Sequence, residues 1–366
     1  MASSCAVALP AWRVFALALA VQVPCVVVLH VAGVLVYALR RDRRLAPLLW
    51  PAAAAIGALP FWLLPLALAR AGADAQLGAF VGATAFSFSA FRTIEAALGT
   101  TPTAATVSLH AWLLYFTSSI DPVYADGARH TPAAPGALRQ RLARVPVRMI
   151  ALGALCSLLL PHGPSSPLAA ALARARAPAL VVLWASNVIY SIALWLFLAL
   201  CFDVGAAPLL AQGVAVGEAF LNPVFAAHSP KEFWGQRWNR QVNALLRRAC
   251  FKPLASVAGP AAAALLTFGV SALFHEYQFA LTFQGGGYRL GRVSAFFGAM
   301  ASLCLAQTAC ERVPALRALA RALPEPVQIG LNICTLAPFG HWFVLIWVEH
   351  GFMDTIARMV PTLSCA

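Results

Sequence analysis

The chain has 366 residues, of which 61% are hydrophobic and only 11% are charged. Soluble domains carry about twice this charged fraction, so the composition excludes an ordinary soluble domain and indicates a multi-pass membrane protein. The net charge of +13 would suggest nucleic-acid binding in a soluble protein. Here the basic residues lie in short segments between apolar runs, where the positive-inside rule explains them better. We therefore expect a lipid bilayer, and no nucleic acid, as partner.

The apolar runs predict an all-α fold, a polytopic transmembrane helix bundle of about eight spans in a single domain covering residues 1–366. A helix needs roughly 20 apolar residues to cross a bilayer. The candidate spans are residues 11–39, 45–69, 77–98, 145–161, 178–202, 254–283, 293–311 and 326–350. Two shorter apolar pieces, 104–120 and 206–221, are flanked by Pro or Gly and are predicted to be interfacial or re-entrant.

The basic segments predict how the bundle is oriented. The strongest are residues 40–44, 129–148, 231–252 and 312–321. If the two short apolar pieces do not cross, all four segments fall on one side, and the positive-inside rule makes that side cytosolic. If either piece crosses, the basic segments are split between two faces. We therefore prefer eight crossings and expect residues 231–252 to face the cytosol.

Some unusual residues inside the apolar runs have structural interpretations. The nine cysteines are scattered and form no C-x-x-C pair, so they are interpreted as small core residues, and we expect no metal site. Arg92 and Glu95 lie three residues apart at the end of the 77–98 span. They are predicted to form an ion pair on one helix face.

Residues 234–249, in the basic segment before the 254–283 span, carry an amphipathic pattern. Apolar side chains recur at spacings of 4, 4, 3 and 4 residues, at Trp234, Trp238, Val242, Leu245 and Ala249. Polar side chains recur at 4, 3 and 4 on another face, at Gln236, Arg240, Asn243 and Arg247. The pattern predicts one amphipathic helix at the membrane surface. A plain anchoring helix has the same pattern, so the periodicity alone indicates no chemistry.

An ionisable pair, His275 and Glu276, lies inside the apolar run 254–283. Ionisable groups at membrane depth are costly and often mark a proton path or a reaction site. The alternative is a structural histidine that bonds a neighbouring helix. A straight helix starting near Leu254 would place His275 about 30 Å away, near its far end. Gly259 and Pro260 would shorten the buried part.

Two motifs together resemble a known enzyme family. The segment F-W-G-Q-R-W-N at 233–239, preceded by N-P at 222–223 and S-P at 229–230, resembles the F-W-G-R-R-W-N segment of wax synthases. These are long-chain-alcohol O-fatty-acyltransferases of the membrane-bound O-acyltransferase superfamily. The segment 268–276, F-G-V-S-A-L-F-H-E, resembles their F-x-V-S-G-L-x-H-E helix. The best-matching core is 218–311. Gln236 stands where the family often has Arg, and Ala272 where it often has Gly.

The resemblance implies transfer of a fatty acyl group from acyl-CoA to a long-chain alcohol, which forms a wax ester at the endoplasmic reticulum. It implies acyl-CoA as co-substrate, with no metal and no other cofactor. His275 would be the general base, since a neutral imidazole titrates near the operating pH. Asn239 would hold the acyl carbonyl or orient the reactants, as an amide donor does at a developing oxyanion.

The resemblance also implies roles in substrate binding for the aromatic and basic residues around Asn239. Trp234 and Trp238 would shape the entrance for acyl-CoA. The basic residues that could contact the CoA phosphates are Arg237, Arg240, Arg247, Arg248 and Lys252. Most of these charges are equally well explained as surface and topology charges.

Other functions remain open at the level of sequence. Within the same reaction class, the acceptor can be a sterol or another lipid alcohol, or the acyl donor can be short. A different class is a proton-coupled membrane transporter in which His275 and Glu276 relay protons. Such transporters favour paired broken helices in two related halves, which we do not find in this sequence. A non-catalytic membrane scaffold is a third class, and the oligomeric state is left open.

Overall fold

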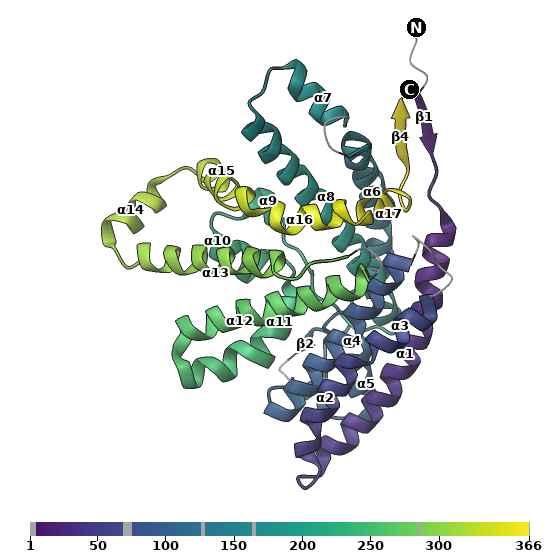
Figure 1. Cartoon of the computed structure of the whole chain (residues 1–366). Coiled ribbons are helices and arrows are strands. Elements are labelled where there is room, and N and C mark those ends of the chain that lie inside the picture. The colour runs from purple at the N-terminus through teal and green to yellow at the C-terminus, as the bar shows by residue number, and fades with distance from the viewer. Residues whose placement is uncertain (1–4, 69–74, 126–128, 163–165, 285–286, 366) are drawn as a thin grey trace.

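The computed structural model of the chain describes residues 5–68, 75–125, 129–162, 166–284 and 287–365. These residues are mostly helical, and their paired strands form two short two-stranded ladders (Figure 1). Among them, seven helices are long and apolar enough to cross a membrane, and a bent helix pair brings the number to eight. The predicted all-α membrane bundle is therefore confirmed. Residue 69, the last of the predicted 45–69 span, lies outside the described residues.

The eight candidate spans follow the predicted apolar runs. They are α1 (Trp12–Arg41), α2 (Leu49–Ala58) with α3 (Pro60–Leu68), α4 (Ala75–Leu98), α6 (Ala137–Leu159), α8 (Ala179–Ala211), α11 (Arg240–Leu246) with α12 (Lys252–Thr282), α13 (Arg292–Cys310), and α15 (Glu325–Leu336) with α16 (His341–Glu349). The last pair is bent by 55°. The shorter helices are α5 (Leu109–Thr117), α7 (Pro167–Arg174), α9 (Pro223–Ala226), α10 (Pro230–Glu232), α14 (Pro314–Ala322) and α17 (Phe352–Ala357). Strand β1 (Cys5–Ala8) pairs antiparallel with β4 (Thr362–Cys365), and β2 (Tyr124–Ala125) with β3 (Arg129–His130).

The two shorter apolar pieces contain no separate helix long enough to cross a bilayer. Residues 104–120 contain the nine-residue helix α5, which buries Trp112, Tyr115 and Phe116 completely. Residues 206–211 are the end of α8, and the rest of the 206–221 piece is turn and loop that forms bridges to 122 and 132. The eight candidate membrane crossings are therefore the eight longer apolar runs, without these two pieces.

Helix α4 is the centre of the bundle. In its most apolar window 72% of the residues are buried, whereas the corresponding share in the other six long candidate helices lies between 22% and 39%. One hydrophobic cluster packs α4 with α1, α2 and α5. A second cluster packs it with α8, α12, α13 and α16. The other helices expose large apolar side chains, as expected for surfaces that face lipid.

A buried network of charges fixes the segment before α12 to α4. Arg248 donates from Nε to Glu95 at 3.0 Å and from a terminal nitrogen to Asp121 at 2.7 Å. Arg92 donates to the same Asp121 at 2.8 Å, and Tyr115 donates to Glu95. The direct Arg92–Glu95 pair expected from their spacing is not formed. The charges of two arginines and two carboxylates compensate one another, as buried charges must. Arg248 therefore belongs to this buried ion-pair network.

Helix α12, which carries His275, is broken at Gly259. Gly259 has φ 79° and ψ 163°, a backbone region that is essentially restricted to glycine. Pro260 follows and has no N–H to contribute to the helix. The break therefore lies at the two residues that were expected to shorten the buried part of this helix, and His275 belongs to the segment after it.

Replacing Gly259 by alanine should lower the stability of the protein by about 1–3 kcal/mol, because alanine cannot adopt this backbone conformation without strain. An added Cβ would meet no atom within 4 Å, so the cost is conformational rather than steric. Gly269 on the same helix provides the control, since its Cβ would also meet open space while its backbone is helical. Gly269→Ala should be neutral or stabilising by up to about 1 kcal/mol. Thermal unfolding in detergent measures the stability of both variants. Equal unfolding midpoints would contradict the conclusion that the backbone conformation at Gly259 requires glycine.

Candidate active site

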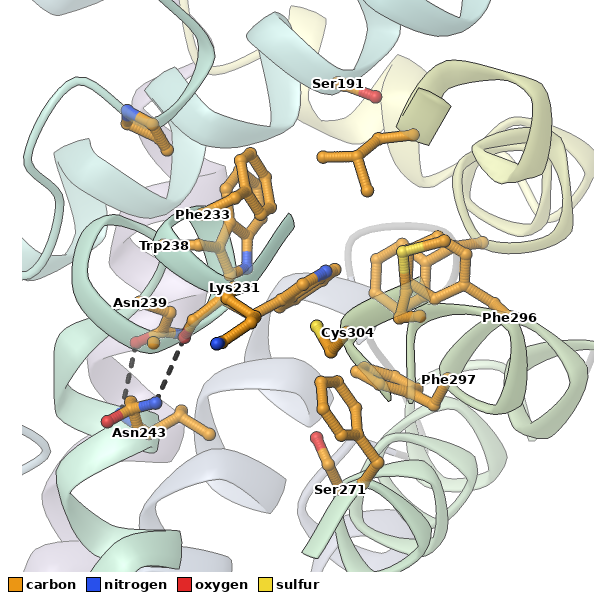
Figure 2. Close-up of a pocket in the computed structure, with 18 of the residues that line it drawn as sticks. Ser191, Lys231, Phe233, Trp238, Asn239, Asn243, Ser271, Phe296, Phe297 and Cys304 are labelled. Carbon is orange, nitrogen blue, oxygen red and sulfur yellow. Dashed lines mark hydrogen bonds between the residues drawn. The ribbon is translucent and has the colours of Figure 1, made fainter. Parts of the chain in front are cut away.

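A cavity of about 520 Å³ lies where α8, α12, α13, the α15–α16 pair and residues 223–251 meet (Figure 2). Its wall is largely aromatic and contains Phe233, Trp234, Trp238, Phe296, Phe297 and Phe343. His275 and Asn239 line the same cavity. Two sequence motifs about forty residues apart in the chain therefore meet in one largely apolar pocket, which is the usual form of a small-molecule site.

His275 is oriented by a hydrogen bond within its own helix. Its Nδ1 lies 2.7 Å from the backbone oxygen of Ser271, one turn earlier on α12. A carbonyl oxygen only accepts, so Nδ1 carries the hydrogen, and in the neutral imidazole Nε2 is then the acceptor. Among the described residues none hydrogen-bonds Nε2, and the ring packs against Phe297 and Phe343 with centroids 4.6 and 5.6 Å apart. The side chain thus offers one proton acceptor to a largely apolar wall.

Glu276, whose role the sequence left open, binds the start of α13 instead of His275. Its carboxylate accepts hydrogen bonds from Tyr288 Oη at 2.5 Å and from the backbone N–H of Gly291 at 2.8 Å. Ser294 adds its N–H at 3.0 Å and its hydroxyl at 2.8 Å. A carboxylate at a helix N-terminus is favourable because free N–H groups converge there. Glu276 therefore ties α12 to α13, and residues of both helices line the cavity.

The single amphipathic helix predicted for residues 234–249 is wrong. Residues Phe233–Arg237 form a π-helical turn, and the chain then breaks at Asn239 before α11 begins. Asn239 has φ 35° and ψ 64°, and its Oδ1 accepts from the N–H of Val242 at 3.3 Å. Asparagine tolerates the left-handed conformation and is a preferred helix N-cap. This local preference overrides the apolar periodicity.

The break folds the tryptophans into the cavity wall. Trp234 contacts Phe268, Phe296 and Phe297, with ring centroids 5.9 to 6.2 Å apart. Trp238 stacks on Phe233 at 5.3 Å. Asn243 bridges the two sides of the break, since its side chain donates to the Trp234 carbonyl and its N–H to the Asn239 carbonyl, both at 3.0 Å (Figure 2). The aromatic wall is therefore supported by the same segment that positions Asn239.

The predicted arginine contacts are distributed differently. Arg237 pairs with Glu232 at 2.7 Å and donates to the Leu221 carbonyl at 3.0 Å. Arg240 donates to the Glu218 carbonyl at 3.4 Å. Neither residue lines the cavity, whereas Arg247 does. Of the six predicted site residues, the structure thus brings His275, Asn239, Trp234 and Trp238 to the cavity and leaves Arg237 and Arg240 outside it.

Lys231 and Asn332 are among the polar cavity residues that were not predicted from the sequence. Lys231 lines the cavity, and its Nζ pairs with Glu311 at 2.5 Å. Asn332 lines it from α15, is 4% exposed, and donates to the Ala227 carbonyl at 3.1 Å. Asn332 lies in the apolar run 326–350, and a buried amide in a predicted span is itself a signal of a polar contact. Lys231 gave no such signal, because it begins a basic segment.

Comparison with known proteins agrees with the two motifs. A family model described as the membrane-bound O-acyltransferase family matches residues 124–322, which include Asn239 and His275. Acyl-CoA–sterol O-acyltransferase 1 of Arabidopsis thaliana is 34% identical over 98 residues, which are 25% of this chain and 28% of that protein. The chain therefore matches little more than a quarter of the length of this relative.

Proposed function

Because the chain belongs to the membrane-bound O-acyltransferase family, we propose that it transfers a fatty acyl group from acyl-CoA to the hydroxyl of a lipid alcohol. The observation that carries this proposal is the single acceptor nitrogen of His275 in an aromatic cavity that it shares with Asn239. A thioester is already activated, so the reaction mainly needs a base and correct placement. We place the enzyme in the endoplasmic reticulum membrane with residues 231–252 toward the cytosol.

In the proposed reaction Nε2 of His275 takes the proton of the acceptor hydroxyl while the hydroxyl oxygen attacks the thioester carbonyl. The tetrahedral intermediate carries negative charge on the former carbonyl oxygen. Asn239 is the proposed donor to this oxygen, because its Oδ1 is used by the helix cap and its amide N–H groups remain for the substrate. Collapse breaks the C–S bond, and the CoA thiolate takes the proton from the imidazolium. The products are the ester and CoA, and the step needs no metal and no further cofactor.

Two acceptors have specific support. A long-chain alcohol, which would give a wax ester, is supported by the resemblance of residues 233–239 and 268–276 to wax synthases. A sterol is supported by the name of the plant relative, an acyl-CoA–sterol O-acyltransferase. Both acceptors present one hydroxyl on a large apolar body, which suits a cavity with an aromatic wall and few polar groups.

The test is an assay of purified protein with labelled acyl-CoA and a matched panel of long-chain alcohols and sterols. We expect labelled ester with at least one acceptor, and the acceptor with the highest kcat/KM identifies the physiological class. Acyl chain length is varied in the same assay to identify the donor. Folded protein that forms no ester with any lipid alcohol would contradict the proposal.

A further inference from the structure

A second hollow of about 640 Å³ lies beside the cavity, at the end of α13. It is lined by Ser229 and Pro230, by the last turn of α13 and the residues after it, and by one face of α14. Figure 1 shows α14 at the outer end of α13, on the way to α15. Three arginines line this hollow, Arg312, Arg317 and Arg321. We call it the arginine groove.

Helix α14 turns its arginines toward the groove. Arg317 and Arg321 are one turn apart and line the groove together with Leu316 and Ala320. Leu319 does not line it and is 61% exposed. The remaining face of the helix consists largely of alanines, and none of its residues is buried. In a membrane protein this outer apolar face suits lipid, so the guanidinium groups are presented to the hollow.

Three arginines and one glutamate line the groove, so its lining has a net positive charge. Glu311 lines it, but Lys231 holds that carboxylate at 2.5 Å and Gln307 donates to it at 2.7 Å. These bonds lower the pKa of Glu311 and keep it ionised. Arg317 donates only to the backbone oxygen of Glu311, at 2.6 Å. Within the described part of the chain, Arg312, Arg317 and Arg321 form no close ion pair with a carboxylate, and the charge of Arg317 acts on Glu311, which Lys231 already neutralises. Guanidinium forks of this kind recognise phosphate.

The arginine groove borders the cavity that contains His275. Pro230 lines the groove and the next residue, Lys231, lines the cavity. On α13, Thr308 lines the groove and Cys304, one turn earlier on the same face, lines the cavity. The Lys231–Glu311 ion pair lies on the border between the two. From Phe297 beside His275 to the end of α13 the helix rises about 20 Å.

We infer that the arginine groove binds the phosphate groups of CoA while the thioester lies beside His275. This inference rests on the proposed function and adds the place where the donor is recognised. CoA carries its phosphates at the far end of an extended pantetheine arm, so its two ends require two separate sites joined by a continuous path. A basic groove beside an apolar cavity supplies these two sites. An anionic lipid headgroup offers the same phosphate chemistry, and the experiment distinguishes the two sources.

The test compares wild type with the double variant Arg317→Ala/Arg321→Ala in neutral detergent, using acyl-CoA and the corresponding acyl thioester of dephospho-CoA. The KM for acyl-CoA should rise about tenfold or more with kcat nearly unchanged, because two charge-assisted contacts to the ground state are lost. The wild type should also prefer acyl-CoA to the dephospho analogue, and the double variant should lose part of that preference. Arg43→Ala/Arg44→Ala is the control, since it removes the same charge from exposed residues of another segment.

An unchanged KM and an unchanged preference in the double variant would overturn the inference. An effect that appears only in vesicles containing phosphatidylserine would assign the groove to lipid headgroups and also overturn it. Inactive wild-type protein would count against the proposed function instead. In that case, calorimetry with free CoA still tests whether the groove binds CoA. The wild type should bind CoA more tightly than the double variant, and equal affinities would refute the proposed phosphate site.

Discussion

His275→Ala should lower the turnover for ester formation by about 10²–10⁴-fold, the usual contribution of a general base. The substitution removes the proton acceptor that the cavity offers to the substrate hydroxyl, while Asn239 and the aromatic wall stay in place. Expression, membrane insertion and thermal stability should be close to wild type. Ester formation from labelled acyl-CoA by equal amounts of folded protein measures the effect.

His350 is a matched control for this substitution. Its Nδ1 bonds the backbone oxygen of Ile346, one turn earlier, at 2.9 Å, which is the local geometry of His275. His350 stacks on Phe283 with centroids 4.7 Å apart and does not line the cavity. His350→Ala should therefore keep its turnover. If both variants stay active, the hydrogen bond to the preceding turn is a structural feature of helical histidines in this chain, and His275 is not the base.

Asn239→Asp should lower turnover by about 10²–10³-fold, the typical cost of a lost oxyanion donor. Aspartate is as good an N-cap as asparagine and also tolerates the left-handed backbone, so α11 should begin at the same residue. What changes is the amide donor. Asn239→Gly removes the donor without adding a charge and keeps the backbone conformation. Both variants should therefore lose kcat more than they raise the KM for acyl-CoA.

Asn239→Ala is a poorer probe, because alanine loses the cap and also strains the backbone at φ 35°. These two effects together cost about 2 kcal/mol or more of stability. Thermal unfolding separates them from a catalytic effect. Normal turnover in both Asn239→Asp and Asn239→Gly would show that Asn239 is only a helix cap, and the catalytic assignment would then be limited to His275.

The spans could be predicted from the sequence because each depends on local composition. About 20 consecutive apolar residues are required wherever a helix crosses lipid, and this requirement does not depend on neighbouring segments. A Gly-Pro pair disfavours a continuous helix locally, and at Gly259 and Pro260 the sequence predicted a shortened buried part but not the break itself. His275 stood out because ionisable residues are rare at membrane depth.

The polar contacts could not be predicted in the same way, because they join residues that are distant in the chain. Arg92 and Glu95 were expected to pair from their helical spacing, but Asp121 and Arg248 compete for them once the helices pack. Glu276 likewise bonds residues 12 to 18 positions away. At Asn239 a local signal did exist, since asparagine is a common helix N-cap. The regular spacing of the tryptophans and the apolar residues after them nevertheless led to the prediction of one continuous helix.

The measurement that tests the central claim most directly is acceptor-dependent release of CoA by purified wild-type and His275→Ala protein. If the His275 cavity carries out acyl transfer, free CoA should appear only when a lipid alcohol is present, in equal amount to the ester, and the variant should release almost none. CoA release that does not depend on the alcohol, or equal release by wild type and variant, would contradict the account.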